Sequence, residues 1–333
     1  MTGIDPSAAA RRVFPDRRVV SVSPIGRGNR KRTSVVEFAA SPPVVVQIGG
    51  VEALRSEAAA TVAIDDATAV PVPTVLAGGV VGEDRGGDAY LITELVRGGD
   101  LHERFADLDP ERRRAVAHDF GRYLGEIHAA TAFEAFGAVG PTGENWAGDE
   151  WPTEAGVSAL AVRERTEPVA WIERYGRAAL DRLPPAFDAV ATRIRRRLET
   201  AATDAVRDPT GRASEAVLFP WDLRPGNALV DEDGVAAVLD WESPMAAPAA
   251  LAVAKVEYLV VDWYLDDPSA ERTAFRAGYE SVRPYPEVDP LSRALAVADT
   301  AVDSTGAVTN PMYPELDREA AVEFHRDALS RAL

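Results

Sequence analysis

The spacing of apolar residues along this chain changes once, near residue 97, and that change limits the folds open to it. Before it, runs of β-branched and apolar residues predict strands at 19–24, 33–39, 44–48, 73–77 and 89–95. A helical pattern at 51–65 separates the third strand from the fourth, and a turn at 82–88 joins the last two. These elements predict a small antiparallel β-sheet with one packed helix.

After Arg97-Gly98-Gly99 the pattern is mainly helical. The clearest helix is predicted at 110–130, where apolar residues recur at helical spacing and Pro110 stands at the start. Only residues 216–239 are expected to interrupt the helices with strands. We therefore expect an α+β chain, with a sheet lobe at 1–96, a hinge near 94–98 and a larger helical lobe at 97–333. The other helices are predicted at 167–183, 185–205, 249–265, 270–282 and from residue 317 onward.

Composition excludes several kinds of site. The chain has no cysteine, which removes disulfides, thiol nucleophiles and cysteine-based metal sites. None of its four histidines forms a closely spaced pair, which speaks against a histidine-based metal site. The net charge of −17 should repel nucleic acids and anionic membranes, so neither is expected as a partner.

No segment reads as a secretory signal or a membrane span. The N-terminal residues MTGIDPSAAARRVF lack an apolar core, and the most apolar stretch, 246–264, carries Lys255, Glu257 and Asp262. We therefore expect a cytoplasmic protein. Nothing in the sequence indicates its oligomeric state.

The segment 220–242 reads PWDLRPGNALVDEDGVAAVLDWE. Its apolar runs 228–230 and 235–239 flank an Asp-Glu-Asp-Gly turn, which is typical of a β-hairpin. Such a hairpin would bring Asn227 and Asp240, at its outer ends, close together.

The polar residues of this segment suit one chemistry. Asp222 precedes Asn227 by five residues, across a Pro-Gly loop that can curl back. Phosphoryl transfer uses one carboxylate to orient or deprotonate the attacking hydroxyl, and further oxygen ligands to hold magnesium against a triphosphate. Magnesium is a hard cation, so the carboxylate of Asp240 and the amide oxygen of Asn227 suit it.

The same segment resembles the H-G-D-x-x-x-x-N … D-x-E signature of the aminoglycoside phosphotransferase and choline kinase-like family, which has a protein-kinase-like fold. The resemblance implies Asp222 as the catalytic base, Asn227 and Asp240 as magnesium ligands, and Glu242 as a second acid. It also implies ATP or GTP as the phosphoryl donor and a small-molecule hydroxyl as the acceptor. The alternative is an acidic hairpin exposed on an acidic surface.

Other segments resemble the nucleotide-binding lobe of that family, which would span residues 1–96. Gly26 and Gly28 lie in a run like the glycine-rich loop that covers phosphates, for which a simple turn is the alternative. Glu57 matches the acid of the packed helix, for which an exposed helical glutamate is the alternative. Glu94 lies in a strand-to-hinge passage like that of the family. His128, at a helix end, reads as structural.

The chain departs from the family pattern at the third strand. Gln47 stands where the family has a lysine that contacts the α- and β-phosphates, and an amide supplies no charge. Lys31, at the place of the third glycine, resembles the phosphate lysine that with-no-lysine protein kinases carry in this loop. A solvated loop cation is the alternative reading.

A second departure lies just before Asp222, where Pro220 and Trp221 replace the family's His and Gly. The family's His organises the catalytic loop, so its loss does not by itself abolish activity. These departures keep open a pseudoenzyme that binds nucleotide or a small ligand. An interaction protein that only retains the fold is a third hypothesis.

The acceptor is expected to bind in the helical lobe. Six residues could line a pocket for a cationic or hydroxylated molecule, with core packing as the alternative: Glu257, Asp262, Trp263, Tyr264, Asp266 and Asp267.

The basic residues of the chain are almost all arginine, with only Lys31 and Lys255 as lysines. Acidity with scarce lysine resembles proteins of salt-loving archaea, whose charge is screened by salt. An acidic protein from a GC-rich genome is the alternative.

Overall fold

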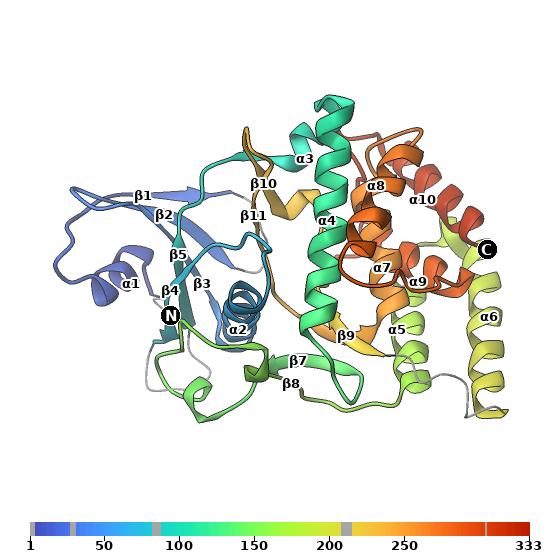
Figure 1. Ribbon diagram of the computed structural model, residues 1–333, viewed down its shortest axis with the longest axis horizontal. Coiled ribbons are helices and arrows are strands. Elements are labelled where there is room, and N and C mark those ends of the chain that lie inside the picture. The colour runs from blue at the N-terminus through green and yellow to red at the C-terminus, as the bar shows by residue number, and fades with distance from the viewer. Residues whose placement is uncertain (1–3, 27–30, 82–87, 208–214, 304) are drawn as a thin grey trace. The chain divides into compact units, whose positions relative to one another are not determined.

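The computed structural model describes residues 4–26, 31–81, 88–207, 215–303 and 305–333 (Figure 1). The predicted turn at 82–88 falls almost entirely outside these residues, as does Gly28. The chain divides into two compact units. The first comprises residues up to 99, 138–163 and 229–244, and the second comprises 100–137, 164–228 and 245–333. The functions expected of the sheet and helical lobes stay predictions.

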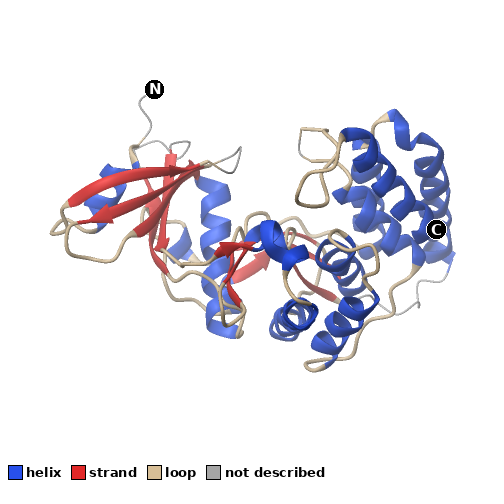
Figure 2. Ribbon diagram, turned by 90° about the horizontal axis from the view of Figure 1, so that it is seen from above, coloured by secondary structure: helices blue, strands red, loops and turns tan. Residues whose placement is uncertain are grey.

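A five-stranded antiparallel sheet dominates the first unit, as the sequence predicts (Figure 2). Helix α2 (Val51–Ala67) follows the third strand directly. The strand order is β1-β2-β3-β5-β4, so the chain forms a three-strand meander before the helix and adds a hairpin after it. The strands are β1 (Val19–Ile25), β2 (Arg32–Phe38), β3 (Val44–Gly50), β4 (Val75–Val80) and β5 (Asp88–Glu94).

A short N-terminal helix, α1 (Pro6–Val13), packs on this sheet although the sequence does not predict it. Asp5 caps it by accepting a hydrogen bond from the Ser7 backbone N–H at 3.2 Å. Its buried Ala9 and Ala10 complete a core with strand residues. Two alanines are a weak apolar signal, so tertiary packing decides this helix.

The predicted hairpin forms in the segment 220–242. Its strands are β10 (Ala228–Val230) and β11 (Val235–Val238). Gly234 adopts φ of 133°, which only glycine reaches without strain, and Asp231 Oδ1 accepts a hydrogen bond from the Asp233 N–H at 2.8 Å. The Val238 N–H donates to the carbonyl of Pro71 at 2.7 Å, which fastens the hairpin within the first unit.

The second unit is mainly helical, as predicted. Helix α4 (Pro110–Ala130) begins at the predicted proline and is capped by Asp109, which accepts from the backbone of Glu111 and Arg112 at 3.0 Å each. It packs against α8, and the other helices are α3 (Leu101–Arg104), α5 (Pro168–Arg182), α6 (Asp188–Arg207), α7 (Ala249–Glu257), α8 (Ser269–Glu280), α9 (Pro290–Thr300) and α10 (Arg318–Ala332).

Two glycines allow the close approach of α4 and α8. A Cβ atom at Gly121 would lie 1.9 Å from the carbonyl oxygen of Phe275. A Cβ atom at Gly278 would lie 1.9 Å from the carbonyl oxygen of His118. Both distances are far below van der Waals contact, so each position requires glycine.

The rest of the chain departs from the sequence predictions in three ways. The helix expected at 249–265 changes at Tyr258 into a π-helix (Tyr258–Asp262), and α9 forms where no helix is predicted. Strands also occur outside 216–239, because runs of two to five residues are too short to show a period. They are β6 (Gly99–Asp100), β7 (Gly137–Pro141), β8 (Leu160–Val162) and β12 (Met245–Pro248), the last paired with β9 (Ala216–Phe219).

Within the described ranges, no helix is both long and apolar enough to span a membrane.

Candidate functional site

A lysine and three carboxylates meet in the first unit. Lys31 Nζ lies 2.6 Å from Glu57 Oε2, 2.7 Å from Asp240 Oδ1 and 3.9 Å from Glu242 Oε2. The side chain of Lys31 is 14 % exposed and that of Glu57 is 5 % exposed. The alternative readings of Lys31 as a solvated cation and of Glu57 as an exposed helical residue are therefore wrong.

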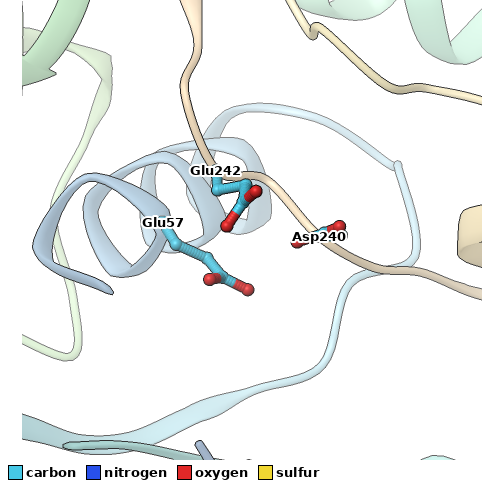
Figure 3. Close-up of side chains that lie close together, drawn as sticks. All are labelled: Glu57, Asp240 and Glu242. Atoms are coloured by element: carbon cyan, nitrogen blue, oxygen red, sulfur yellow. The ribbon is translucent and has the colours of Figure 1, made fainter. Parts of the chain in front are cut away.

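Three separate segments supply these groups. Glu57 lies on α2, and Asp240 and Glu242 lie on the loop that follows β11 (Figure 3). Lys31 directly precedes β2. Asp240 has a φ of 65°, a left-handed conformation that aspartate tolerates better than most residues. The buried Trp241 between the two acids donates from Nε1 to the carbonyl of Val238 at 3.1 Å, which anchors the loop.

The strand register explains how Lys31 reaches Glu57. Arg32 pairs with Ile48 and Thr33 pairs with Gln47 in the antiparallel β2–β3 ladder. A Cβ atom at Gly49 would lie 3.3 Å from the Cβ of Lys31, so Lys31 stands beside Gly49 on β3. The cation beside Glu57 thus comes from the start of β2.

Gln47 supports the same glutamate without adding charge. Its Nε2 donates to Glu57 Oε1 at 3.3 Å. Its own Oε1 is buried and has no hydrogen-bond partner among the described residues. A buried polar atom without a partner is costly, so this amide oxygen is a point where a ligand or water could bind.

Electrostatics couple these groups. Burial alone lowers the pKa of Lys31, but the charges of Glu57 and Asp240 outweigh it and the net pKa is raised. Burial raises the pKa of Glu57, and Asp240 adds to this while Lys31 opposes it. Lys31 is therefore a protonated cation at neutral pH.

One ammonium does not neutralise three carboxylates. One oxygen from each of Glu57, Asp240 and Glu242 lies within 4.8 Å of the others. These hard oxygen donors suit a magnesium ion, whose charge would complement the excess of negative charge.

Two other residues predicted to bind nucleotide lie in the first unit. A Cβ atom at Gly26 would meet nothing within 4 Å, so the space beside this backbone is open. Glu94 ends β5, is exposed, and accepts hydrogen bonds from the N–H and Oγ1 of Thr74 at 3.0 Å each. The roles predicted for Gly26, Gly28 and Glu94 in nucleotide binding stay predictions.

The predicted catalytic aspartate lies in the second unit, in the loop after β9. Asn227 Nδ2 donates to the backbone carbonyl and to Oδ2 of Asp222, both at 3.0 Å. This directs the amide nitrogen of Asn227 toward Asp222 and leaves its oxygen to serve as a ligand elsewhere. A single turn of 3₁₀-helix (Pro225–Asn227) makes this local contact possible.

Arg224 is a site residue that the sequence analysis did not identify. Its Nε lies 2.9 Å from Asp222 Oδ1, and its guanidinium carbon lies 5.6 Å from the ring centroid of Trp263. Both carboxylate oxygens of Asp222 therefore have partners. The signal in the sequence is a cationic residue two positions after the predicted base.

The acids expected near the acceptor are paired with arginines. Glu257 is buried and contacts Arg276 at 2.8 Å, Arg272 at 3.0 Å and Arg293 at 3.5 Å. Burial raises the pKa of Glu257, but Arg276 and its other partners outweigh this and the pKa is lowered. Asp262 pairs with Arg272 at 2.6 Å. These two carboxylates are already neutralised and do not favour a cationic acceptor.

The remaining residues of that group divide by burial. Trp263 and Tyr264 are core residues, whereas Asp266 and Asp267 are exposed. His128 is buried, its Nδ1 lies 2.9 Å from the Tyr279 hydroxyl, and burial, with Arg283, lowers its pKa to about 3. It is a core histidine in the second unit.

Comparison with protein families gives a match over most of the chain. The model of the phosphotransferase enzyme family matches residues 21–291. A search of curated protein sequences finds no match.

Solved structures align over almost the whole chain. A predicted fructosamine-3-kinase from Thermobifida fusca is 22% identical, with a TM-score of 0.55 over 97% of this chain and 99% of that one. A variant of the aminoglycoside phosphotransferase APH(4)-Ia, in a ternary complex with ADP and hygromycin B, is 17% identical, with a TM-score of 0.60 over 98% of both chains. A predicted aminoglycoside phosphotransferase from Ralstonia eutropha is 17% identical, with a TM-score of 0.61 over 98% of both. These likenesses show a protein-kinase-like fold.

Proposed function

Because the chain belongs to the phosphotransferase enzyme family, we propose that it transfers the γ-phosphoryl group of ATP or GTP to a hydroxyl group of a small molecule, with magnesium. The observation that carries this proposal is the pairing of Lys31 with Glu57 and Asp240 in a chain whose third strand bears Gln47. A partly buried cation held by two carboxylates supplies the positive charge that Gln47 lacks.

In this proposal the first unit binds the nucleotide. Lys31 contacts the phosphates, and its ion pair with Glu57 keeps the ammonium in place. Asp240 and Asn227 would hold magnesium, with Glu242 as a further acid. Bound there, magnesium would neutralise charge on the phosphates.

Asp222 acts on the acceptor in this proposal. Its carboxylate orients the acceptor hydroxyl and takes its proton as the oxygen bonds to the γ-phosphorus. The bond from that phosphorus to the β–γ bridging oxygen breaks, and the nucleoside diphosphate leaves. Arg224, 2.9 Å from Asp222, is a second cation for the transferred group.

A nucleotide-binding pseudoenzyme is the second candidate. Gln47 and Pro220 favour it, because Gln47 replaces the lysine of the third strand and Pro220 replaces the His of the family signature. Nucleotide binding with magnesium and without transfer to any acceptor would support this candidate.

The deciding experiment is a panel of small hydroxyl compounds, assayed with ATP and with GTP for phosphoryl transfer. The assays run from low to high potassium chloride, because the acidic, lysine-poor composition predicts a salt requirement. Asp222→Asn is the control, and transfer that survives it unchanged would overturn the assigned role of Asp222. A magnesium-dependent thermal shift with each nucleotide separates a pseudoenzyme from a chain that binds neither.

A further inference from the structure

The tryptophan next to the predicted base carries a buried cation on its ring. Lys255 Nζ lies 3.8 Å from the ring centroid of Trp221 and 5.4 Å from that of Phe219. Lys255 is on α7 and its side chain is 2 % exposed. A cation attracts the face of an indole ring, and the attraction strengthens when water is excluded.

Lys255 is itself held by a buried ion pair. Its Nζ lies 2.6 Å from Oδ2 of Asp299 on α9, which is equally buried, and Arg182 of α5 ion-pairs with the same carboxylate. Replacing a buried ion pair by apolar residues is often neutral or stabilising. Stability is therefore a weak explanation for this network, and a positioning role is the better one.

Aromatic side chains hold the Trp221 ring as well. Tyr175 of α5 meets it edge-on, with centroids 6.1 Å apart and planes at 78°. Phe219 lies 6.1 Å away at 48°. The ring thus touches groups from two helices and from the strand that leads into the loop.

We infer that Trp221 and Lys255 are positioning residues that hold the loop from Asp222 to Asn227 in its working conformation. They take the place of the His and Gly that the family signature has here. Pro220 restricts the backbone before Trp221, and its carbonyl accepts a hydrogen bond from the Leu223 N–H at 3.3 Å. With the Trp221 side chain held as well, the backbone on both sides of Asp222 has little freedom. This inference rests on the proposed function.

The test compares Lys255→Met, which removes the charge and keeps an unbranched apolar side chain, with Lys255→Arg, which keeps the charge. Lys255→Met should lower kcat by about 10-fold or more, because small misplacements of a catalytic group are costly, with nucleotide KM changed by less than about 3-fold. Lys255→Arg should recover part of kcat. The matched control is Arg113→Met, which also removes a cation paired with a buried acid, Glu271, at 3.2 Å.

A second readout does not depend on activity. In protein labelled with 5-fluorotryptophan, the ¹⁹F signal of Trp221 is the one missing from Trp221→Phe. It should shift in Lys255→Met and stay in place in Arg113→Met. An unshifted Trp221 signal in folded Lys255→Met, or an equal loss of kcat in Arg113→Met, would overturn the inference.

If Lys255→Met does not fold, Trp221→Leu and Trp221→Phe decide the question. Trp221 is only partly buried, and Phe keeps a ring face for the ammonium whereas Leu does not. Leu should cause the larger loss of kcat, and equal losses would contradict the inference. If the parent protein transfers phosphate to no acceptor, the proposed function fails, while the ¹⁹F comparison still tests the contact.

Discussion

Lys31 Nζ lies 2.6 Å from Glu57 Oε2, so the acid of α2 is paired with a cation that precedes β2. Gln47, on β3, contacts the other oxygen of the same glutamate at 3.3 Å. Lys31, just before β2, and Gln47, on the neighbouring strand β3, therefore share one carboxylate. In the proposed function, Lys31 would serve the nucleotide while still paired with Glu57, provided that Asp240 gained another cation.

Lys31→Met should weaken nucleotide binding. A hydrogen bond to a charged group contributes roughly 1.5–3 kcal/mol, so the Kd for ATP or GTP should rise about 10- to 100-fold. Calorimetric titration with magnesium present measures this. Arg32→Met is the matched control, since Arg32 is the exposed neighbour and donates to the carbonyl of Ile4. Equal changes in Kd for the two variants would contradict the role of Lys31.

Moving the cation to β3 should rescue that loss. Gln47 Nε2 lies within hydrogen-bond reach of Glu57, so a lysine at this position can reach the same carboxylate. Lys31→Met combined with Gln47→Lys should bind nucleotide more tightly than Lys31→Met alone. The same titration measures it, and a double variant no better than Lys31→Met would show that position 47 cannot present a charge to the site.

Substitutions of Asp240 and Glu242, the two acids of the loop after β11, should affect the magnesium requirement to different extents. Asp240→Asn removes a carboxylate that pairs directly with Lys31 at 2.7 Å, whereas Glu242 lies 3.9 Å away. Asp240→Asn should abolish magnesium-dependent nucleotide binding, and Glu242→Gln should raise the magnesium concentration needed. Thermal shifts across a magnesium series at fixed nucleotide test this. Unchanged magnesium dependence in Asp240→Asn would exclude Asp240 as a ligand.

Two buried histidines should make the fold sensitive to acid. Burial, with Arg283, lowers the pKa of His128 to about 3, and burial lowers that of His325 to about 4. Between these values and the unfolded pKa of 6.5, the unfolded chain binds more protons than the folded one. Stability contributed by the two neutral rings is therefore present above pH 6.5 and is lost as the pH falls below it.

Denaturant titrations between pH 4.5 and 6.5 check this. His325→Gln should flatten the pH dependence of the unfolding free energy by up to about 1.4 kcal/mol per pH unit, the share of one proton. An unchanged slope would mean that the pKa of His325 does not differ between the folded and unfolded states.

Gly121→Ala should destabilise the second unit. The new Cβ would lie 1.9 Å from the carbonyl oxygen of Phe275, so α4 and α8 would have to move apart. Overpacking costs about 1–3 kcal/mol, and backbone contact places this case at the upper end. Gly125→Ala, with a Cβ 3.1 Å from the Tyr279 carbonyl oxygen, should cost less. Chemical denaturation compares them, and equal costs would contradict the packing argument.

Local sequence patterns were sufficient for much of the fold. The strands and α2 follow from apolar periodicity, α4 begins at its proline, and the β10–β11 hairpin follows from the Asp-Gly turn. Each depends on residues close together in the chain. Several of the elements missed, such as α1 and the short strands β7 and β12, have too few residues to show a clear period, whereas α9 was missed although it has 11 residues.

In the candidate site too, the features predicted from the sequence depend on residues close together in the chain, and the others depend on distant residues. The sequence by itself determined that Asp222 and Asn227 belong to one loop, because Asn227 follows Asp222 by five positions across a Pro-Gly turn. It could not decide whether Lys31 is a solvated cation, since its partners Glu57 and Asp240 are 26 and 209 residues away. Only the tertiary structure brings those carboxylates to the ammonium. Burial and charge then make Lys31 part of the site.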